Sequence, residues 1–151
     1  MAAGKSTLAR KIAQQEDAIL VVQDEFLSKL FPDEIVDISS FVKYSLRLND
    51  ALAAHICSLL SKGICVVLDF PGNTKKQRTW FRELFERTNA DHELHYVDAT
   101  DELCKRQLRE RSKEFAEGSA FTSDAEFDAI TKYVIAQLRQ NVGFSHFSVI
   151  F

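Results

Sequence analysis

The sequence lacks the features that mark secreted, membrane-spanning or nucleic-acid-binding proteins. Its three cysteines cannot all pair with one another and have no metal-site spacing, so we expect reduced thiols and a cytoplasmic protein. Charged residues interrupt each apolar run before it could span a bilayer, and no secretion signal is visible. A net charge of -3 gives no general attraction to nucleic acid or anionic lipid. We therefore expect neither a nucleic acid nor a membrane as partner, and the sequence leaves the oligomeric state open.

What is present is the composition of one globular domain. The 151 residues are 46% hydrophobic and 27% charged, which suits a chain with a single core. No internal repeat, linker or low-complexity segment divides them. We expect one domain over residues 1–151.

Helical and strand-like segments alternate along the chain. The first helix is expected over Lys5–Gln15, and a second, longer one runs from a cap at Ser39 or Ser40 to a stop at Gly63. A third helix should follow the capping box of Thr74 and Gln77, and a fourth should begin at Thr100. A fifth should follow a second capping box at Ser123 and Glu126. Short apolar runs predict strands over residues 18–23, 64–68, 93–98 and 147–151. This order predicts an α/β fold, in which helices cover a parallel sheet and ligands bind beyond the carboxyl ends of the strands.

The clearest motif is Ala3-Gly4-Lys5-Ser6-Thr7, which opens the first expected helix. It matches the end of the phosphate-binding loop Gly-x-x-x-x-Gly-Lys-Ser/Thr. Gly4 would let the backbone approach a phosphate, and the helix amides and dipole would favour the anion. Lys5 would reach the β- and γ-phosphates of ATP, and the Ser6 hydroxyl would ligate Mg²⁺. The alternative is a capped helix that happens to contain these residues.

The phosphate loop is incomplete in this chain. Only three residues precede Gly4, whereas the full motif places four residues between its two glycines. We therefore expect the sheet to lack the first central strand, which would feed the loop. Either the chain is a piece of a longer protein, or it is a domain truncated at its N-terminus.

Acidic residues stand where three of the expected strands end, and they should meet at one edge of the sheet. Asp69 follows Val66-Val67-Leu68, as the Mg²⁺-binding acid of a P-loop protein follows its strand, and would hold the metal directly or through water. The alternative is a solvated acid at a strand end. Asp24 and Asp98 stand at the ends of two other expected strands, and we assign no role to Asp98.

Four segments in order carry a resemblance to a known family: residues 3–9, 22–25, 66–70 and 108–111. On these, the chain from Met1 to about Phe147 resembles the small P-loop kinases grouped with zeta toxins, chloramphenicol phosphotransferase and shikimate kinase. It is most similar to a branch described as ATP-binding or AAA-type ATPase. The resemblance implies a P-loop NTPase fold like that of nucleoside monophosphate kinases.

The resemblance also implies roles for individual residues. In such kinases an acid at the end of the strand after the phosphate-loop helix serves the acceptor, which places Asp24 as the group that orients a substrate hydroxyl, with Glu25 as the substitute and a helix cap as the alternative. A lid at about residues 105–122 would close over ATP, and its arginines would stabilise the transferring phosphoryl group. Arg106 and Arg111 are the first choices, with Arg109 third. The alternative for this charged run is a solvated helix face.

The sequence thus predicts a phosphotransferase that uses ATP and Mg²⁺ on a small hydroxylated acceptor. The alternatives are a non-catalytic nucleotide-binding protein, or an NTPase with water as the acceptor. The acceptor is not identified. The stretch before the last expected strand keeps only Gly143-Phe144 of the relatives' adenine-side loop, so base selectivity is open as well.

Overall fold

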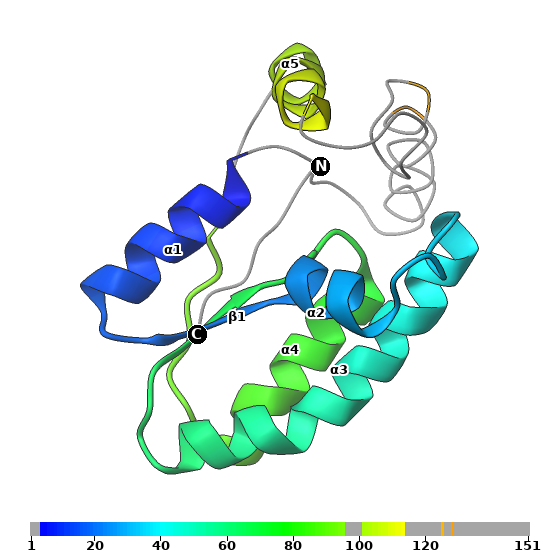
Figure 1. Cartoon of the computed structure of the whole chain (residues 1–151). Coiled ribbons are helices and arrows are strands. Elements are labelled where there is room, and N and C mark those ends of the chain that lie inside the picture. Colours follow the sequence, from blue (N-terminus) through cyan, green and yellow to red (C-terminus); the bar gives the residue numbers. More distant parts are fainter. Residues whose placement is uncertain (1–3, 96–100, 114–124, 126–127, 129–151) are drawn as a thin grey trace.

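The computed structural model describes residues 4–95, 101–113, 125 and 128 of the chain. Along these residues helices and strands alternate (Figure 1): α1 (Lys5–Gln15), β1 (Ile19–Val22), α2 (Gln23–Leu30), α3 (Ile38–Ser61), β2 (Val66–Asp69), α4 (Lys75–Thr88) and α5 (Asp101–Ser112). The helix expected after Ser123 and the strand expected over residues 147–151 lie outside the described residues, apart from Ala125 and Asp128.

The two strands pair in parallel, with Ile19 opposite Val66 and Val22 opposite Asp69. Side chains of β2 alternate between the two faces of this sheet, as the pleat requires. Val66 and Leu68 pack into a core with Ile56 of α3 and with α4, whereas Val67 packs against α1. Helices therefore cover both faces, which is why the strands read as continuous apolar runs rather than alternating ones.

The expected third strand is not present over the part of 93–98 that the structure describes. Glu93 makes an isolated bridge, and Leu94 and His95 belong to no strand. Leu94 is exposed, and the side chain of Glu93 turns outward to pair with His95 at 3.1 Å. The described residues thus form a parallel sheet of two strands.

The helix starts confirm one sequence prediction and correct another. Thr74 and Gln77 form the expected capping box at the start of α4. The cap of α3 is Asp37 rather than Ser39 or Ser40, because the Asp37 carboxylate accepts from the Ser40 N–H at 2.7 Å and Ser40 Oγ accepts from the Asp37 N–H at 3.0 Å. An aspartate with a serine three positions later forms the same reciprocal box as the more familiar pair with glutamate.

The helix end expected at Gly63 is also confirmed. Helix α3 stops at Ser61, and Gly63 has a φ of 72°, the left-handed conformation that glycine adopts without strain. No helix in the described part of the chain has both the length and the apolar character needed to cross a bilayer.

Candidate functional site

The start of α1 has the backbone that a phosphate-binding turn requires. Gly4 is its N-cap residue, with a φ of 78°, and a Cβ there would meet no atom within 4 Å. Backbone conformation rather than crowding therefore favours glycine at this position. No side chain caps α1, and its own first turn carries no acidic residue. Ala3 lies outside the described residues.

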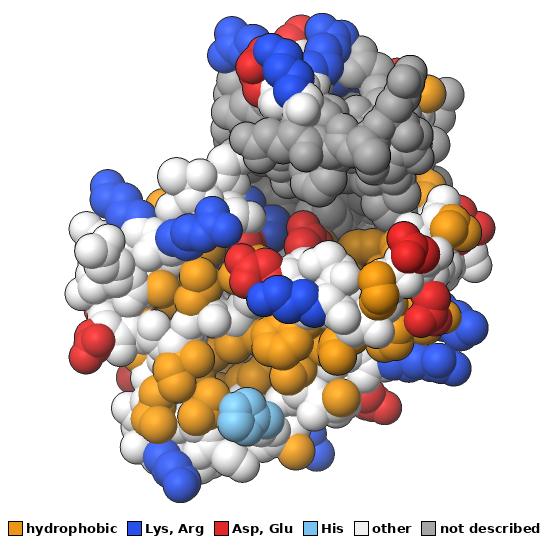
Figure 2. All heavy atoms as spheres, viewed as in Figure 1, with side chains coloured by type: hydrophobic (Ala, Val, Ile, Leu, Met, Phe, Trp, Pro, Cys, Tyr) orange, Lys and Arg blue, Asp and Glu red, His pale blue; other side chains and the backbone are white. Residues whose placement is uncertain are grey.

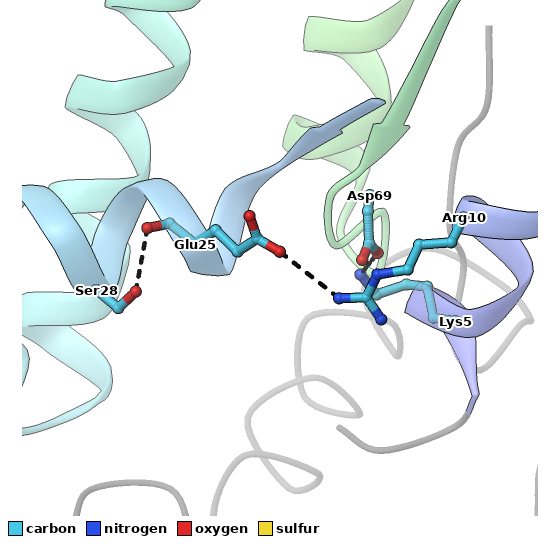
Figure 3. Close-up of polar contacts among 5 residues, drawn as sticks. All are labelled: Lys5, Arg10, Glu25, Ser28 and Asp69. Atoms are coloured by element: carbon cyan, nitrogen blue, oxygen red, sulfur yellow. Dashed lines mark hydrogen bonds and ion pairs between the residues drawn. The ribbon is translucent and has the colours of Figure 1, made fainter. Parts of the chain in front are cut away.

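Lys5 and Asp69 form an ion pair that joins α1 to the carboxyl end of β2 (Figure 3). The two residues lie 64 positions apart in the sequence. The Asp69 side chain is only 1% exposed and that of Lys5 is 25% exposed, so a nearly buried carboxylate is balanced by a cation that solvent can still reach. The structure brings together the residue predicted for the phosphates and the residue predicted for the metal. A buried charge without such a partner would strongly destabilise the fold.

The oxygen groups near this pair suit Mg²⁺. Ser6 follows Lys5 in the first turn of α1 and is half-buried, and Asp69 supplies a carboxylate. No group of three or more His, Cys, Asp or Glu side chains in the described residues could hold a metal ion. Mg²⁺ in phosphate sites uses one or two protein oxygens with water and phosphate oxygens, so Ser6 and Asp69 fit such an ion.

The sequence predicts that Asp24 stands at the end of a strand, but the structure does not place it there. Strand β1 stops at Val22 and α2 begins at Gln23, so Asp24 and Glu25 are exposed residues in the first turn of a helix. Acids are favoured there because the positive end of the helix dipole lies beside them. The two side chains leave α2 about 100° apart rather than on opposite sides of an extended segment.

Glu25 is the acid that the structure connects to the phosphate-loop helix. Its carboxylate points towards the guanidinium of Arg10 on α1, with Oε1 and Nη2 3.6 Å apart (Figure 3). Both side chains are more than half exposed. Sequence analysis gave no sign of this pair, because the contact depends on how α1 and α2 lie across the sheet.

The basic segment expected as a lid begins in α5. Residues 105–112 belong to this helix, and residues 114–122 lie outside the described part of the chain. Cys104 and Leu108 are fully buried, whereas Arg106 and Arg109 are exposed, and Figure 2 shows basic side chains gathered over α5. Within the described residues no hydrogen bond or ion pair joins Arg106 to Lys5 or Asp69. Arg111 lies in α5, but its side chain is outside the described part.

The loop after β2 is braced by a residue without a predicted role. Nη1 of Arg78 donates to the carbonyl oxygens of Gly72 and Asn73, at 2.9 and 3.2 Å. These bonds tie the first turns of α4 to the chain that leaves Asp69. Arg78 therefore helps to fix the carboxyl end of β2.

A left-handed glycine before Lys-Ser-Thr at a helix start, with the lysine paired to a buried acid at the end of a parallel strand, defines a P-loop of the nucleotide-binding kind. A family model described as an AAA domain matches residues 1–135. The chain belongs to this P-loop, kinase-like AAA family and has its P-loop NTPase fold. Such proteins generally bind a nucleotide with Mg²⁺. No significant match was found among curated proteins or solved structures.

Proposed function

We propose that this chain is a phosphotransferase that moves the γ-phosphoryl group of ATP to a hydroxyl of a small acceptor in the cytoplasm. The observation that carries the proposal is the Lys5–Asp69 ion pair, which lies at the same edge of the sheet as the first turn of α2. Phosphate-binding and acceptor-binding groups would thus meet at the carboxyl ends of neighbouring strands, where open α/β sheets bind ligands. We treat residues 1–151 as one domain with a lid at about 105–122.

The phosphate side of the site would be built from α1 and β2. The backbone from Ala3 to Thr7 would surround the β- and γ-phosphates, and Lys5 would turn from Asp69 to them. Ser6 and Asp69 would hold Mg²⁺, which supplies charge neutralisation at the phosphates when bound. Arg106 and Arg111 on α5 would add positive charge if the lid closes.

The acceptor side would be built from α2. Asp24 would accept the proton of the acceptor hydroxyl as the oxygen bonds to the γ-phosphorus and the bond from phosphorus to the β–γ bridging oxygen breaks. The products are ADP and a phosphorylated acceptor. Glu25 is the substitute, and its pairing with Arg10 holds it towards α1.

ADP formation tests the proposal against its two alternatives. It should be measured with Mg·ATP alone and with a panel of hydroxylated metabolites, alongside calorimetry of ATP binding. A phosphotransferase forms ADP in proportion to a phosphorylated acceptor, whereas an NTPase forms ADP equally fast without one. ATP binding with no ADP under either condition would support the non-catalytic alternative, and the absence of ATP binding would refute all three.

A further inference from the structure

A small polar cluster is buried between α2 and α3, directly beside Asp24. It consists of Gln23, the first residue of α2, with Ser45 and Asn49 of α3, which are 1%, 8% and 9% exposed. Nε2 of Gln23 donates to Oδ1 of Asn49 at 2.8 Å. Ser45 lies one turn before Asn49 on the same buried face of the helix.

Two atoms of this cluster have no hydrogen-bond partner among the residues that the structure describes. They are Oε1 of Gln23 and Oγ of Ser45. The neighbouring buried positions, Leu27 on α2 and Leu48 on α3, are apolar. An apolar side chain would fill such a position without leaving a polar atom unpaired, and an unpaired buried polar atom lowers stability. Packing alone therefore does not account for Gln23 and Ser45.

The cluster lies at the edge of the sheet where α/β folds bind their ligands. Helix α3 has 24 residues and is roughly 36 Å long, whereas each four-residue strand spans roughly 13 Å. Because α3 runs back from the carboxyl end of β1 to the start of β2, its first half extends past the carboxyl edge of the sheet (Figure 1). Asn49 meets Gln23 at that edge, and Ser45 lies about one turn farther out, on the acceptor side of the proposed site.

We propose that Gln23 and Ser45 form a recognition subsite for a neutral polyol, an acceptor with a hydroxyl next to the one that is phosphorylated. This inference rests on the proposed phosphotransferase. Oε1 of Gln23 would accept from the second hydroxyl, and Oγ of Ser45 would donate to the same oxygen or to the next one. Asn49 positions the Gln23 amide through the 2.8 Å bond. Since both unpaired atoms are buried, α2 must shift from α3 to admit the acceptor.

The chemistry of the cluster disfavours an anionic group at this point. Its three side chains are neutral, and Arg78, on the helix after β2, already donates to two backbone carbonyls. A carboxylate facing Oε1 of Gln23 would place two acceptors together with no proton between them. A desolvated anion without a cation beside it is costly, so the subsite should favour a neutral polyol over the matching acid.

Ser45→Ala is the sharpest test, because it removes an unpaired hydroxyl and breaks no hydrogen bond within the described residues. The matched control is Ser58→Ala on the same helix, where the hydroxyl donates to the Ala54 carbonyl on an exposed face. The probes are glycerol and ribose, each compared with its acid, glycerate or ribonate, under saturating Mg·ATP. Phosphorylated product, ATP affinity and the urea midpoint are measured for each protein.

We expect transfer to a neutral polyol, with KM about three- to tenfold higher in Ser45→Ala and with kcat and ATP affinity unchanged, the pattern of a lost binding contact. The urea midpoint of this variant should equal or exceed that of the parent, and Ser58→Ala should leave KM unchanged. An unchanged KM in Ser45→Ala, a clearly lower urea midpoint, or a preference for the acids would overturn the subsite. Lys5-dependent transfer to an acid in preference to the matching polyol would refute the subsite and leave the proposed function standing. The absence of transfer to any of the probes would also refute the subsite. The absence of ATP binding would refute both the subsite and the proposed function.

Discussion

The ends of the two strands lie side by side in the sheet but have different chemistry. Val22, opposite Asp69 in the register, leads directly into the neutral, buried Gln23. Asp69 is itself buried and charged, and Lys5, which lies 64 positions earlier in the sequence, balances its charge. The comparison shows how one sheet edge can separate two kinds of chemistry. A charge is buried where a partly exposed cation balances it, and neutral hydrogen-bonding groups occupy the neighbouring position.

The largest effect should follow a change on the charged side. Lys5→Ala removes the cation aimed at the phosphates and should weaken ATP binding by about ten- to hundredfold, the usual loss for a hydrogen bond to a charged group, and abolish transfer. Calorimetry measures the affinity, and Lys11→Ala, an exposed lysine of the same helix, is the control. Equal ATP affinity in Lys5→Ala and the parent would remove the phosphate role from this strand end.

The next effect concerns the acids of α2. Asp24→Asn should lower phosphoryl transfer by roughly two to four orders of magnitude and leave ATP affinity almost unchanged, because a positioned acid or base acts mainly in the transition state. Glu25→Gln should lower transfer much less, since its side chain leaves the helix in another direction and contacts Arg10. Single-turnover rates of transfer from Mg·ATP to an acceptor that the parent protein phosphorylates measure both effects. The reverse order of effects would make Glu25 the acceptor-facing acid.

A smaller effect is expected in the loop that holds Asp69. Thr74→Ala removes the side-chain cap that accepts from the Gln77 N–H at 3.2 Å, and should lower the free energy of unfolding by about 1 kcal/mol. Urea unfolding measures this as a lower midpoint with an unchanged slope. Thr79→Ala, an exposed threonine in the same helix, is the control and should leave the midpoint almost unchanged.

The exposed ion pair between α1 and α2 should contribute less to the free energy of unfolding than the Thr74 cap does. Arg10 and Glu25 are both more than half exposed, so water screens them and their coupling should be below about 1 kcal/mol. A double-mutant cycle of Arg10→Gln and Glu25→Gln, run at low and high salt, measures the coupling. Strong coupling that persists in high salt would mean that the pair is more rigid than an exposed contact.

The smallest effect should be the part of the pH dependence of stability that comes from Asp37, the cap of α3. Hydrogen bonds from the Ser40 side chain and backbone lower the pKa of Asp37, the cap of α3. A carboxylate with a depressed pKa stabilises the fold above its unfolded value of about 3.9, and this stability is lost as the pH falls through the lower folded value. Asp37→Asn keeps a capping side chain, so its urea midpoint should fall less than that of the parent between pH 7 and pH 3. Equal falls would exclude this contribution.

Local signals predicted most of the helices in the described residues. The spacing of apolar residues gave α1 with the bounds that the structure has, and Thr74 with Gln77 located the start of α4. The prediction was wrong where two local preferences compete. Gln23 extends an apolar run that reads as a strand, yet it pairs with Asn49 and begins a helix. Glu93 begins a run with strand-like alternation, but Glu93 and Leu94, in the part of the run that the structure describes, are exposed and cover no sheet face.

The sequence pointed to the two residues of the ion pair but not to their arrangement. Two separate motifs identified Lys5 and Asp69, because each lies next to the element that positions it. Their pairing depends on the strand register, and the contact of Gln23 with Asn49 depends on how α2 packs against α3. Neither relation leaves a pattern in a single sequence. The predicted roles of all the site residues stay predictions: Ala3, Gly4, Lys5, Ser6, Thr7, Asp24, Asp69, Arg106 and Arg111.

The Lys5–Asp69 pair has a consequence for how ligands would share the site. Once Lys5 turns towards a triphosphate, the nearly buried Asp69 carboxylate loses its counter-charge while more negative charge arrives nearby. A divalent cation bound with the nucleotide restores that balance. The two ligands would therefore be thermodynamically linked, each raising the affinity of the other by the same factor. ATP without a divalent cation would have to leave a buried charge uncompensated, so this one contact would make the affinity for the metal–nucleotide complex higher than the affinity for either component alone.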